Sequence, residues 1–296
     1  MSASYAAASR TRPSWLRGCG SRVPVSGICV GLLMTMPISC GRPGEMIRPA
    51  KDQWPQSFKR VAVLGESTVE GGGWVPAQAD RYADVLVSLI NRVQAEPAAY
   101  VNCGIGASVI SPKSPGYEAS RKPSAMERYR TDVIAPKPDL VVIAYGLNDM
   151  RAGMDVGVFI GELETIVRDV QSSCGALVVL VNVYHMTGYG WYPPFDRGSV
   201  EATVTYNDAI RRLAARRACL YADVYSAEAR ADWVIHQDGV HANKVGNLLI
   251  ANKIFEVLAT HCSGLSEAVR RHDETTEWTK AVRQMRHGKV EPVKKP

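Results

Sequence analysis

The sequence predicts an α/β fold, a three-layer α/β/α sandwich around a mainly parallel sheet of five strands. Five short apolar runs are typical of buried strands, and stretches with helical apolar spacing lie between them. Strands that alternate with helices in this way favour a parallel sheet covered on both faces. The expected strands are residues 61–64, 100–101, 140–145, 177–184 and 220–224, and the expected helices are residues 80–94, 155–172, 200–217 and 242–260.

The first 40 residues predict an export signal or a disordered leader. Residues 1–22 contain four arginines and no acid, and residues 23–38 are small and apolar. This order is typical of a signal peptide, and the apolar part is short for a membrane-spanning helix. Cys40 follows a small residue, as in a bacterial lipoprotein cleavage site. We therefore expect an exported protein, either periplasmic, secreted or lipid-anchored at Cys40, which would attach it to a membrane; a cytoplasmic chain is the alternative.

Three further segments follow the leader. Residues 41–59 are polar and rich in proline, which predicts a linker, and residues 60–262 form the expected folded domain. Residues 263–296 are charged and contain one helical candidate at about 265–286. This C-terminal segment is either an attachment helix or a solvated helix with a frayed tail. No protein partner can be inferred from it.

The positive charge of the chain belongs to its N-terminus. The formal charge is +6, of which residues 1–60 carry +7 and the remainder −1. A nearly neutral domain does not favour nucleic-acid binding. None of the seven cysteines is spaced as CxxC, so we expect no zinc site of the usual kind and interpret the cysteines near strands as buried thiols.

The first candidate catalytic residue is Ser67, directly after the 61–64 run. The carboxyl ends of parallel strands form the catalytic edge of an open sheet, so Ser67 lies where a nucleophile is needed. A serine hydroxyl becomes a good nucleophile only when a base removes its proton. The sequence Gly-Glu-Ser-Thr-Val lacks the second glycine of the G-x-S-x-G elbow of α/β hydrolases. A turn-forming serine is the alternative interpretation.

Two further turns follow the second and third strands. In Asn-Cys-Gly-Ile-Gly-Ala-Ser at residues 102–108, glycines let backbone N–H groups approach a ligand closely. Val109 takes the place of the third glycine of G-x-G-x-x-G, and no G-K-[ST] occurs, so nucleotide binding is not expected. Asn148, in Gly-Leu-Asn-Asp, carries an amide that can donate to an oxyanion, with a plain turn as the alternative.

The fourth stretch, His-Gln-Asp-Gly-Val-His at residues 236–241, precedes the last helix of the domain. The Asp238 carboxylate can hold the His241 ring so that its other nitrogen acts as a general base. A metal site formed by His236, Asp238 and His241 is the alternative. No further cluster of histidine or glutamate supports it, so we expect no metal.

Taken together, these stretches resemble the SGNH hydrolase superfamily, also called GDSL esterases and lipases. Its four blocks, G-D-S, N-x-G, G-x-N-D and D-x-x-H, occur in this order between about residues 60 and 258, and the last two match fully. Glu66 replaces the aspartate of the first block, which is not a triad member in the family. The resemblance implies the flavodoxin-like fold of the superfamily and a triad of Ser67, Asp238 and His241.

The resemblance also implies the groups that hold the oxyanion. They are the Ser67 backbone N–H, the Asn148 side chain and one N–H of the glycine-bearing loop. By its spacing from Asn102, Ala107 takes the place of the family's glycine, and Gly106 is the second choice. Since the donor is a backbone group, alanine is acceptable there if its φ and ψ permit.

We therefore expect a serine esterase that hydrolyses carboxylic esters without a metal or organic cofactor. Residues 186–195 form an aromatic loop after the fourth strand, and Trp191 and Tyr192 are candidate substrate contacts. No long apolar lid is visible, which favours a small-acyl ester or a carbohydrate O-acetyl ester over a triglyceride. An acyltransferase of the same fold and a catalytically inactive binding protein are the alternatives.

Overall fold

The computed structural model describes residues 51–287 of the 296-residue chain. The predicted export signal with Cys40, the first part of the predicted linker and the end of the tail lie outside the described residues. Their properties therefore stay predictions. Within residues 51–287, no helix is both long enough and apolar enough to cross a membrane.

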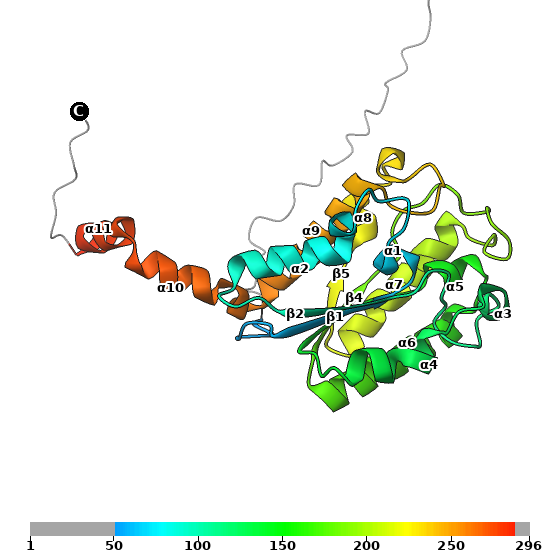
Figure 1. Cartoon of the computed structure of the whole chain (residues 1–296), viewed down its shortest axis with the longest axis horizontal. Helices are drawn as coiled ribbons and strands as arrows, with labels where there is room; N and C mark the ends of the chain where they lie inside the picture. The colour runs from blue at the N-terminus through cyan, green and yellow to red at the C-terminus, as the bar shows by residue number, and fades with distance from the viewer. Residues whose placement is uncertain (1–50, 288–296) are drawn as a thin grey trace, which may run out of the picture. The chain divides into compact units, whose positions relative to one another are not determined.

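A five-stranded parallel sheet forms the centre of the domain (Figure 1). Its strand order is β2-β1-β3-β4-β5, and every neighbouring pair is parallel. This order is the flavodoxin-like one, so the predicted fold class is confirmed. The strands are β1 (Arg60–Gly65), β2 (Ala99–Gly104), β3 (Leu140–Ala144), β4 (Leu177–Val181) and β5 (Leu220–Ala222).

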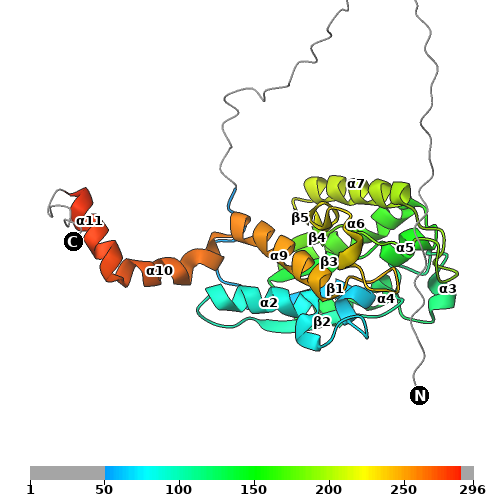
Figure 2. The same ribbon diagram turned by 90° about the horizontal axis from the view of Figure 1, so that it is seen from above.

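Helices cover both faces of the sheet, as Figures 1 and 2 show. Helices α2 (Tyr82–Val93) and α9 (Lys244–His261) pack against each other on one face, and α4 (Ala125–Tyr129), α6 (Val156–Cys174) and α7 (Val200–Arg216) lie on the other. The remaining helices are α1 (Ser67–Glu70), α3 (Tyr117–Ser120), α5 (Leu147–Arg151), α8 (Val224–Glu228), α10 (Glu267–Thr275) and α11 (Glu277–Arg286).

The aliphatic runs explain why the sheet forms where it does. The central strands β1, β3 and β4 are buried along nearly their whole length, whereas the edge strand β2 is partly exposed. Continuous apolar strands of this kind need cover on both faces. The predicted fourth strand, 177–184, is too long, because β4 ends at Val181 and the Asn182 side chain instead accepts the backbone N–H of Val224 at 2.8 Å.

Polar side chains fix the beginnings of the long helices. The Asp155 carboxylate accepts two backbone N–H groups at the start of α6, Ser199 accepts one at α7, and Asn243 accepts two at α9. Each side chain satisfies donors that have no partner inside the helix. These caps place the helix starts at the catalytic edge of the sheet.

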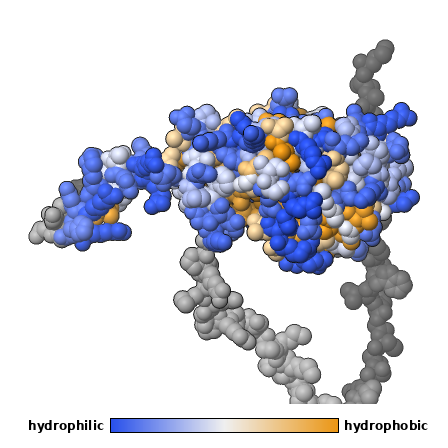
Figure 3. Space-filling view, turned by 90° about the horizontal axis from the view of Figure 1, so that it is seen from below, coloured by the Kyte–Doolittle hydropathy of each residue, from blue (hydrophilic) through white to orange (hydrophobic). Residues whose placement is uncertain are grey.

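Residues near the start of the described chain pack against the residues at the end of α9, whereas α10 and α11 extend away from the sheet (Figures 1 and 2). Phe58 is buried, and the Trp54 carbonyl accepts the backbone N–H of Gly264 at 3.1 Å, so the described part of the predicted linker packs against the protein. Our prediction of a single C-terminal helix is wrong. The chain forms two helices, α10 and α11, because Thr276 is extended and caps α11 with its hydroxyl. Figure 3 shows that hydrophilic residues cover most of this C-terminal pair.

Candidate active site

The predicted site residues all lie at the carboxyl edge of the sheet. Ser67 begins α1 directly after β1, and Asn148 lies in α5 directly after β3. Asp238 and His241 lie in the turn between β5 and α9. Gly104, at the end of β2, lets α1 pack directly on this strand, because a side-chain Cβ there would overlap the backbone N of Glu70.

Ser67, His241 and Asp238 form one continuous hydrogen-bonded chain. The Ser67 Oγ lies 2.9 Å from His241 Nε2, and His241 Nδ1 lies 2.8 Å from Asp238 Oδ2. The other Asp238 oxygen accepts the backbone N–H groups of Val240 and His241, both at 2.9 Å. Asp238 therefore holds both the backbone turn and the ring, and the ring presents Nε2 to the serine.

The electrostatics of this chain suit a general base. Burial works to raise the pKa of Asp238, but hydrogen bonds from the His241 and Val240 backbone and from the His241 ring lower it to about 2. The carboxylate is thus ionised at neutral pH. Burial lowers the pKa of His241, and the Asp238 carboxylate opposes that shift without cancelling it. His241 is therefore neutral at pH 7 and able to accept a proton.

A second histidine approaches the same carboxylate. His236 Nδ1 lies 3.1 Å from Asp238 Oδ2, but its ring makes no recorded contact with Ser67. Between residues 51 and 287, no three His, Cys, Asp or Glu side chains are grouped closely enough to hold a metal ion. Of the two histidine rings, that of His241 is the one hydrogen-bonded to Ser67.

The candidate oxyanion donors differ in their availability. The Gly106 N–H donates to Glu70 Oε2 at 2.8 Å, so this group is occupied. The Ala107 N–H has no recorded acceptor among the described residues, and Ala107 adopts a left-handed φ of 59°. The Asn148 amide donates one hydrogen to the Ser108 carbonyl at 3.0 Å, which leaves its second hydrogen free. Ser67, Ala107 and Asn148 all line one cleft.

Two buried carboxyl groups fix the turns that carry these donors. Glu66 accepts the backbone N–H groups of Gly146 and Asn148 at 2.9 and 3.1 Å, and so ties the nucleophile's strand to the Asn148 turn. Burial raises the pKa of Glu66 well above its usual value, and the nearby Asp149 adds to that shift. Asp149 accepts the Ile110 N–H at 3.0 Å and so ties the start of α5 to the loop that follows β2.

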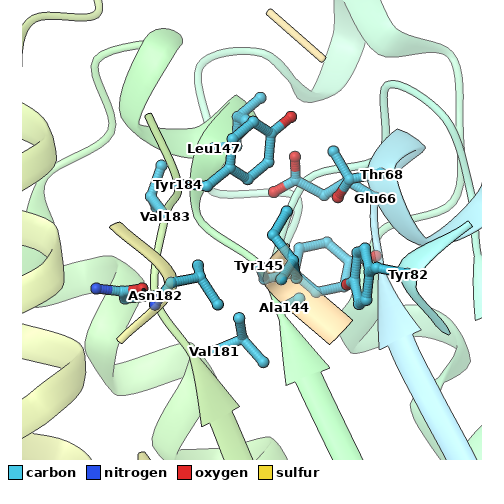
Figure 4. Close-up of a pocket in the computed structure, with 12 residues that line it drawn as sticks. Glu66, Thr68, Tyr82, Ala144, Tyr145, Leu147, Val181, Asn182, Val183 and Tyr184 are labelled. Atoms are coloured by element: carbon cyan, nitrogen blue, oxygen red, sulfur yellow. Dashed lines mark hydrogen bonds between the residues drawn. The ribbon is translucent and has the colours of Figure 1, made fainter. Parts of the chain in front are cut away.

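Figure 4 shows the surroundings of Glu66 on the sheet side. Its carboxyl group lies beside Thr68 at the edge of a small cavity of about 20 Å³, which also has Tyr184 and the ends of β3 and β4 in its wall. This volume is sufficient for one water molecule. Glu66 lines this small cavity and not the cleft that contains Ser67 and His241, which agrees with the expectation that it is not a member of the triad.

The catalytic cleft has a volume of about 360 Å³. Its wall includes Tyr192 from the predicted aromatic loop, together with Phe195 from the same loop. Trp191 is half exposed and does not line the cleft; its ring packs over Gly188 and Gly239. The Tyr192 hydroxyl donates to the Asp238 carbonyl at 3.1 Å, which joins the loop to the turn of the triad.

The sequence analysis missed two residues of the cleft. Trp74 stacks on the His241 ring, with 3.7 Å between ring centroids and 7° between the planes. Arg151 lines the cleft and is almost fully buried. The glycine run before Trp74 was a weak signal of a special turn, whereas nothing in the sequence distinguishes Arg151 from other arginines.

Residues 63–249 match the model of one protein family, the GDSL-like Lipase/Acylhydrolase family. Comparison with curated proteins found no match. Among solved structures, a mutant of Axe2, an acetyl-xylooligosaccharide esterase from Geobacillus stearothermophilus, aligns with a TM-score of 0.54 at 19% identity. The alignment covers 69% of this chain and 95% of that one.

Two other solved structures are similar to the same extent. A lipase/acylhydrolase from Enterococcus faecalis aligns with a TM-score of 0.53 at 22% identity, over 68% of this chain and 95% of that one. The protein TesA aligns with a TM-score of 0.54 at 17% identity, over 68% of this chain and 98% of that one. At these identities the likeness concerns the fold.

Proposed function

The chain belongs to the GDSL-like lipase/acylhydrolase family of ester-hydrolysing enzymes, and we propose that it works as a serine esterase with Ser67 as its nucleophile. The observation that supports this proposal most strongly is the hydrogen-bonded chain of Ser67, His241 and Asp238. Both of its links are shorter than 3 Å, and all three side chains line the cleft.

In the first half of the reaction, the Ser67 Oγ attacks the ester carbonyl while His241 Nε2 takes the hydroxyl proton. The resulting imidazolium is stabilised by the ionised Asp238. His241 then gives the proton to the alcohol oxygen, the C–O bond to the alcohol breaks, and an acyl-enzyme remains on Ser67. A neutral histidine at pH 7 is what this step requires, and the lowered pKa of His241 supplies it.

The tetrahedral oxyanion needs donors on the side of the nucleophile opposite the base. We assign this role to the backbone N–H groups of Ser67 and Ala107 and to the free amide hydrogen of Asn148. One such donor is typically worth about 10²–10³ in rate. Gly106 is less suited, because Glu70 already accepts its N–H.

In the second half, His241 removes a proton from water, the water oxygen attacks the acyl carbonyl, and Ser67 leaves with that proton. The products are the free acid and the enzyme in its starting state. Every step uses side chains and backbone groups of this chain, so the proposed mechanism needs no cofactor.

For the substrate, we propose an ester with a small acyl group, with carbohydrate O-acetyl esters as the first compounds to test. The cleft supports this choice, since its volume of about 360 Å³ and its aromatic residues Trp74, Tyr192 and Phe195 suit a small ring-shaped ligand better than a long acyl chain. The acetyl-xylooligosaccharide esterase among the solved neighbours has a fold of the same kind.

Hydrolysis of p-nitrophenyl acetate by the full chain tests the proposal. We expect turnover by the wild type and a loss of about 10³-fold or more in kcat for Ser67→Ala and for His241→Ala, because members of one catalytic unit fail together. His236→Ala is the matched control, and it should keep activity within about tenfold, since the His236 ring contacts Asp238 but is not hydrogen-bonded to Ser67. Equal losses in both histidine variants would contradict the assignment of the base.

A further inference from the structure

Arg151 brings a positive charge into the catalytic cleft. It lies at the end of α5, three residues after Asn148, and lines the cleft together with Ser67 and His241. Only 3% of its surface is exposed. A guanidinium stays protonated inside a protein, so this buried group carries a full charge next to the reacting atoms.

The hydrogen bonds of Arg151 leave most of the guanidinium without a partner. Its Nη2 donates to the Trp191 carbonyl at 2.8 Å, whereas its Nε is buried and has no hydrogen-bond partner. No ion pair within 4.0 Å involves Arg151 in the part of the chain that the structure describes. A single carbonyl oxygen neither neutralises the charge nor uses the five donors of the group.

Another buried arginine of the same domain shows what a structural partner set looks like. Arg128 is 5% exposed, and it donates to the carbonyls of Gly65 and Cys103, to the Tyr145 hydroxyl and to the Asp132 carboxylate. Arg128 thus has an acid and three neutral acceptors, although its Nε, like that of Arg151, is buried without a partner. Arg151 has one neutral acceptor, so fold stability alone does not account for its charge.

The charged groups around Arg151 attract it only from beyond ion-pair distance. Asp238 is ionised, but it bonds His241 and forms no ion pair with Arg151 within 4.0 Å, and Glu66 is bonded to two backbone N–H groups while its raised pKa favours the neutral form. Burial lowers the pKa of Arg151 itself, and its charge in turn helps to lower the pKa of His241. A buried charge without a counter-ion in direct contact is costly, so a ligand that supplies one is favoured.

We propose that Arg151 binds a carboxylate carried by the ester substrate, so that the cleft selects anionic esters over neutral ones of the same shape. The proposal rests on the esterase function proposed above and specifies its substrate class. A carboxylate is the natural partner, because a guanidinium binds its two oxygens through two parallel N–H···O bonds. The carboxylate of an acidic sugar and that of a dicarboxylic half-ester both have this chemistry.

A binding experiment in the Ser67→Ala variant tests this selectivity without requiring turnover. Calorimetry would compare 4-acetoxybenzoate with its methyl ester, and monophenyl succinate with phenyl butyrate, so that the carboxylate lies once on the alcohol side and once on the acyl side. We expect the anionic member of at least one pair to bind about 10- to 100-fold more tightly, as for hydrogen bonds between charged groups.

Substitution of Arg151 decides whether this residue causes the preference. In the same background, Arg151→Met should reduce the ratio of the two affinities to about one, and Arg151→Lys should keep part of it because the charge remains. Arg197→Met is the matched control: it removes an equal charge from the neighbouring loop, where Arg197 is exposed and outside the cleft wall, and should leave the ratio unchanged.

Three results would overturn the proposal. The first is equal affinity for both members of each ester pair. The second is a preference for the anionic ester that persists in Arg151→Met or is lost equally in Arg197→Met. The third is binding of free acetate as tight as that of the anionic ester, which would mean that Arg151 binds the released acid. If Arg151→Met does not fold, Arg151→Lys and the ester pairs still decide. Turnover of p-nitrophenyl acetate tests the esterase function separately, so the two failures can be told apart.

Discussion

At the scale of single residues, the stacking of Trp74 on His241 links the nucleophile's own segment to the base. Trp74 lies seven residues after Ser67, and His241 lies 174 residues after Ser67, yet the rings of Trp74 and His241 lie face to face. The indole face restrains the imidazole ring, and it attracts the imidazolium that forms in each half of the reaction. We therefore propose that Trp74 positions the ring of the proposed general base.

We predict that Trp74→Leu lowers kcat for p-nitrophenyl acetate by about 2- to 30-fold, the range expected for a cation–π contact. Since leucine keeps the ring buried but cannot attract the imidazolium, the pKa of His241 should fall further. The acidic limb of the pH–rate profile, which should lie below pH 6.5 in the wild type, then moves to lower pH.

Trp74→Phe is the control for this prediction, because it keeps an aromatic face and should change both quantities less. The pH dependence of kcat is the decisive measurement, since loss of packing alone would not move the limb. A profile in Trp74→Leu that superimposes on the wild type after scaling would count against the role of the indole.

The sequence predicted some residues of the site and not others, for a physical reason. Ser67, Asn148, Asp238 and His241 follow strand ends in short motifs, so the parallel topology alone brings them to one edge. Trp74 and Arg151 reach the cleft through the conformations of the Gly71–Gly73 turn and of α5, which single residues in a sequence do not reveal. Likewise, the bond from Gly106 to Glu70 depends on how α1 packs on β2.

At the scale of secondary-structure elements, Glu66 joins β1 to the turn that begins α5. Its two carboxyl oxygens accept the N–H groups of Gly146 and Asn148, so the position of Asn148 relative to Ser67 depends on one side chain. This role explains why an acid precedes the serine although it does not react. Glutamate in place of aspartate fulfils it with one additional methylene.

We predict that Glu66→Gln destabilises the protein by about 1–3 kcal/mol, because the new amide presents a donor to a buried backbone donor. Asn148 should shift as a result, and kcat should fall while KM for a small ester changes little. Urea unfolding and steady-state kinetics measure the two effects. Glu96→Gln, at an exposed position, is the control, and an equally small change in both variants would refute this account of Glu66.

The elements themselves were predicted well where one pattern dominated. The aliphatic runs located all five strands, and apolar spacing located the four long helices on the faces of the sheet. The short helices α1, α3, α4, α5 and α8 escaped prediction, because four or five residues are too few to show a period. The break at Thr276 was missed because a threonine cap competes with a continuous helical pattern only through one hydrogen bond.

At the scale of the whole molecule, the cleft unites segments that follow all five strands. Different parts of the domain carry different roles: residues 53–54 bond to residues 261–264 away from the cleft, and the carboxyl edge of the sheet carries the proposed reacting groups. A sheet whose central strands are aliphatic and buried holds these loops in place. This arrangement explains how a serine, an amide and a histidine from distant parts of the sequence meet within hydrogen-bonding distance.

The central claim is that Ser67 is a nucleophile activated by His241. The most direct measurement is mass spectrometry of the full chain after reaction with a fluorophosphonate probe. The account predicts a single adduct on Ser67, no adduct in Ser67→Ala, and labelling slower by about 10³-fold in His241→Ala. A wild-type protein that stays unlabelled, or that is labelled at another serine with the same rate in all three proteins, would contradict it.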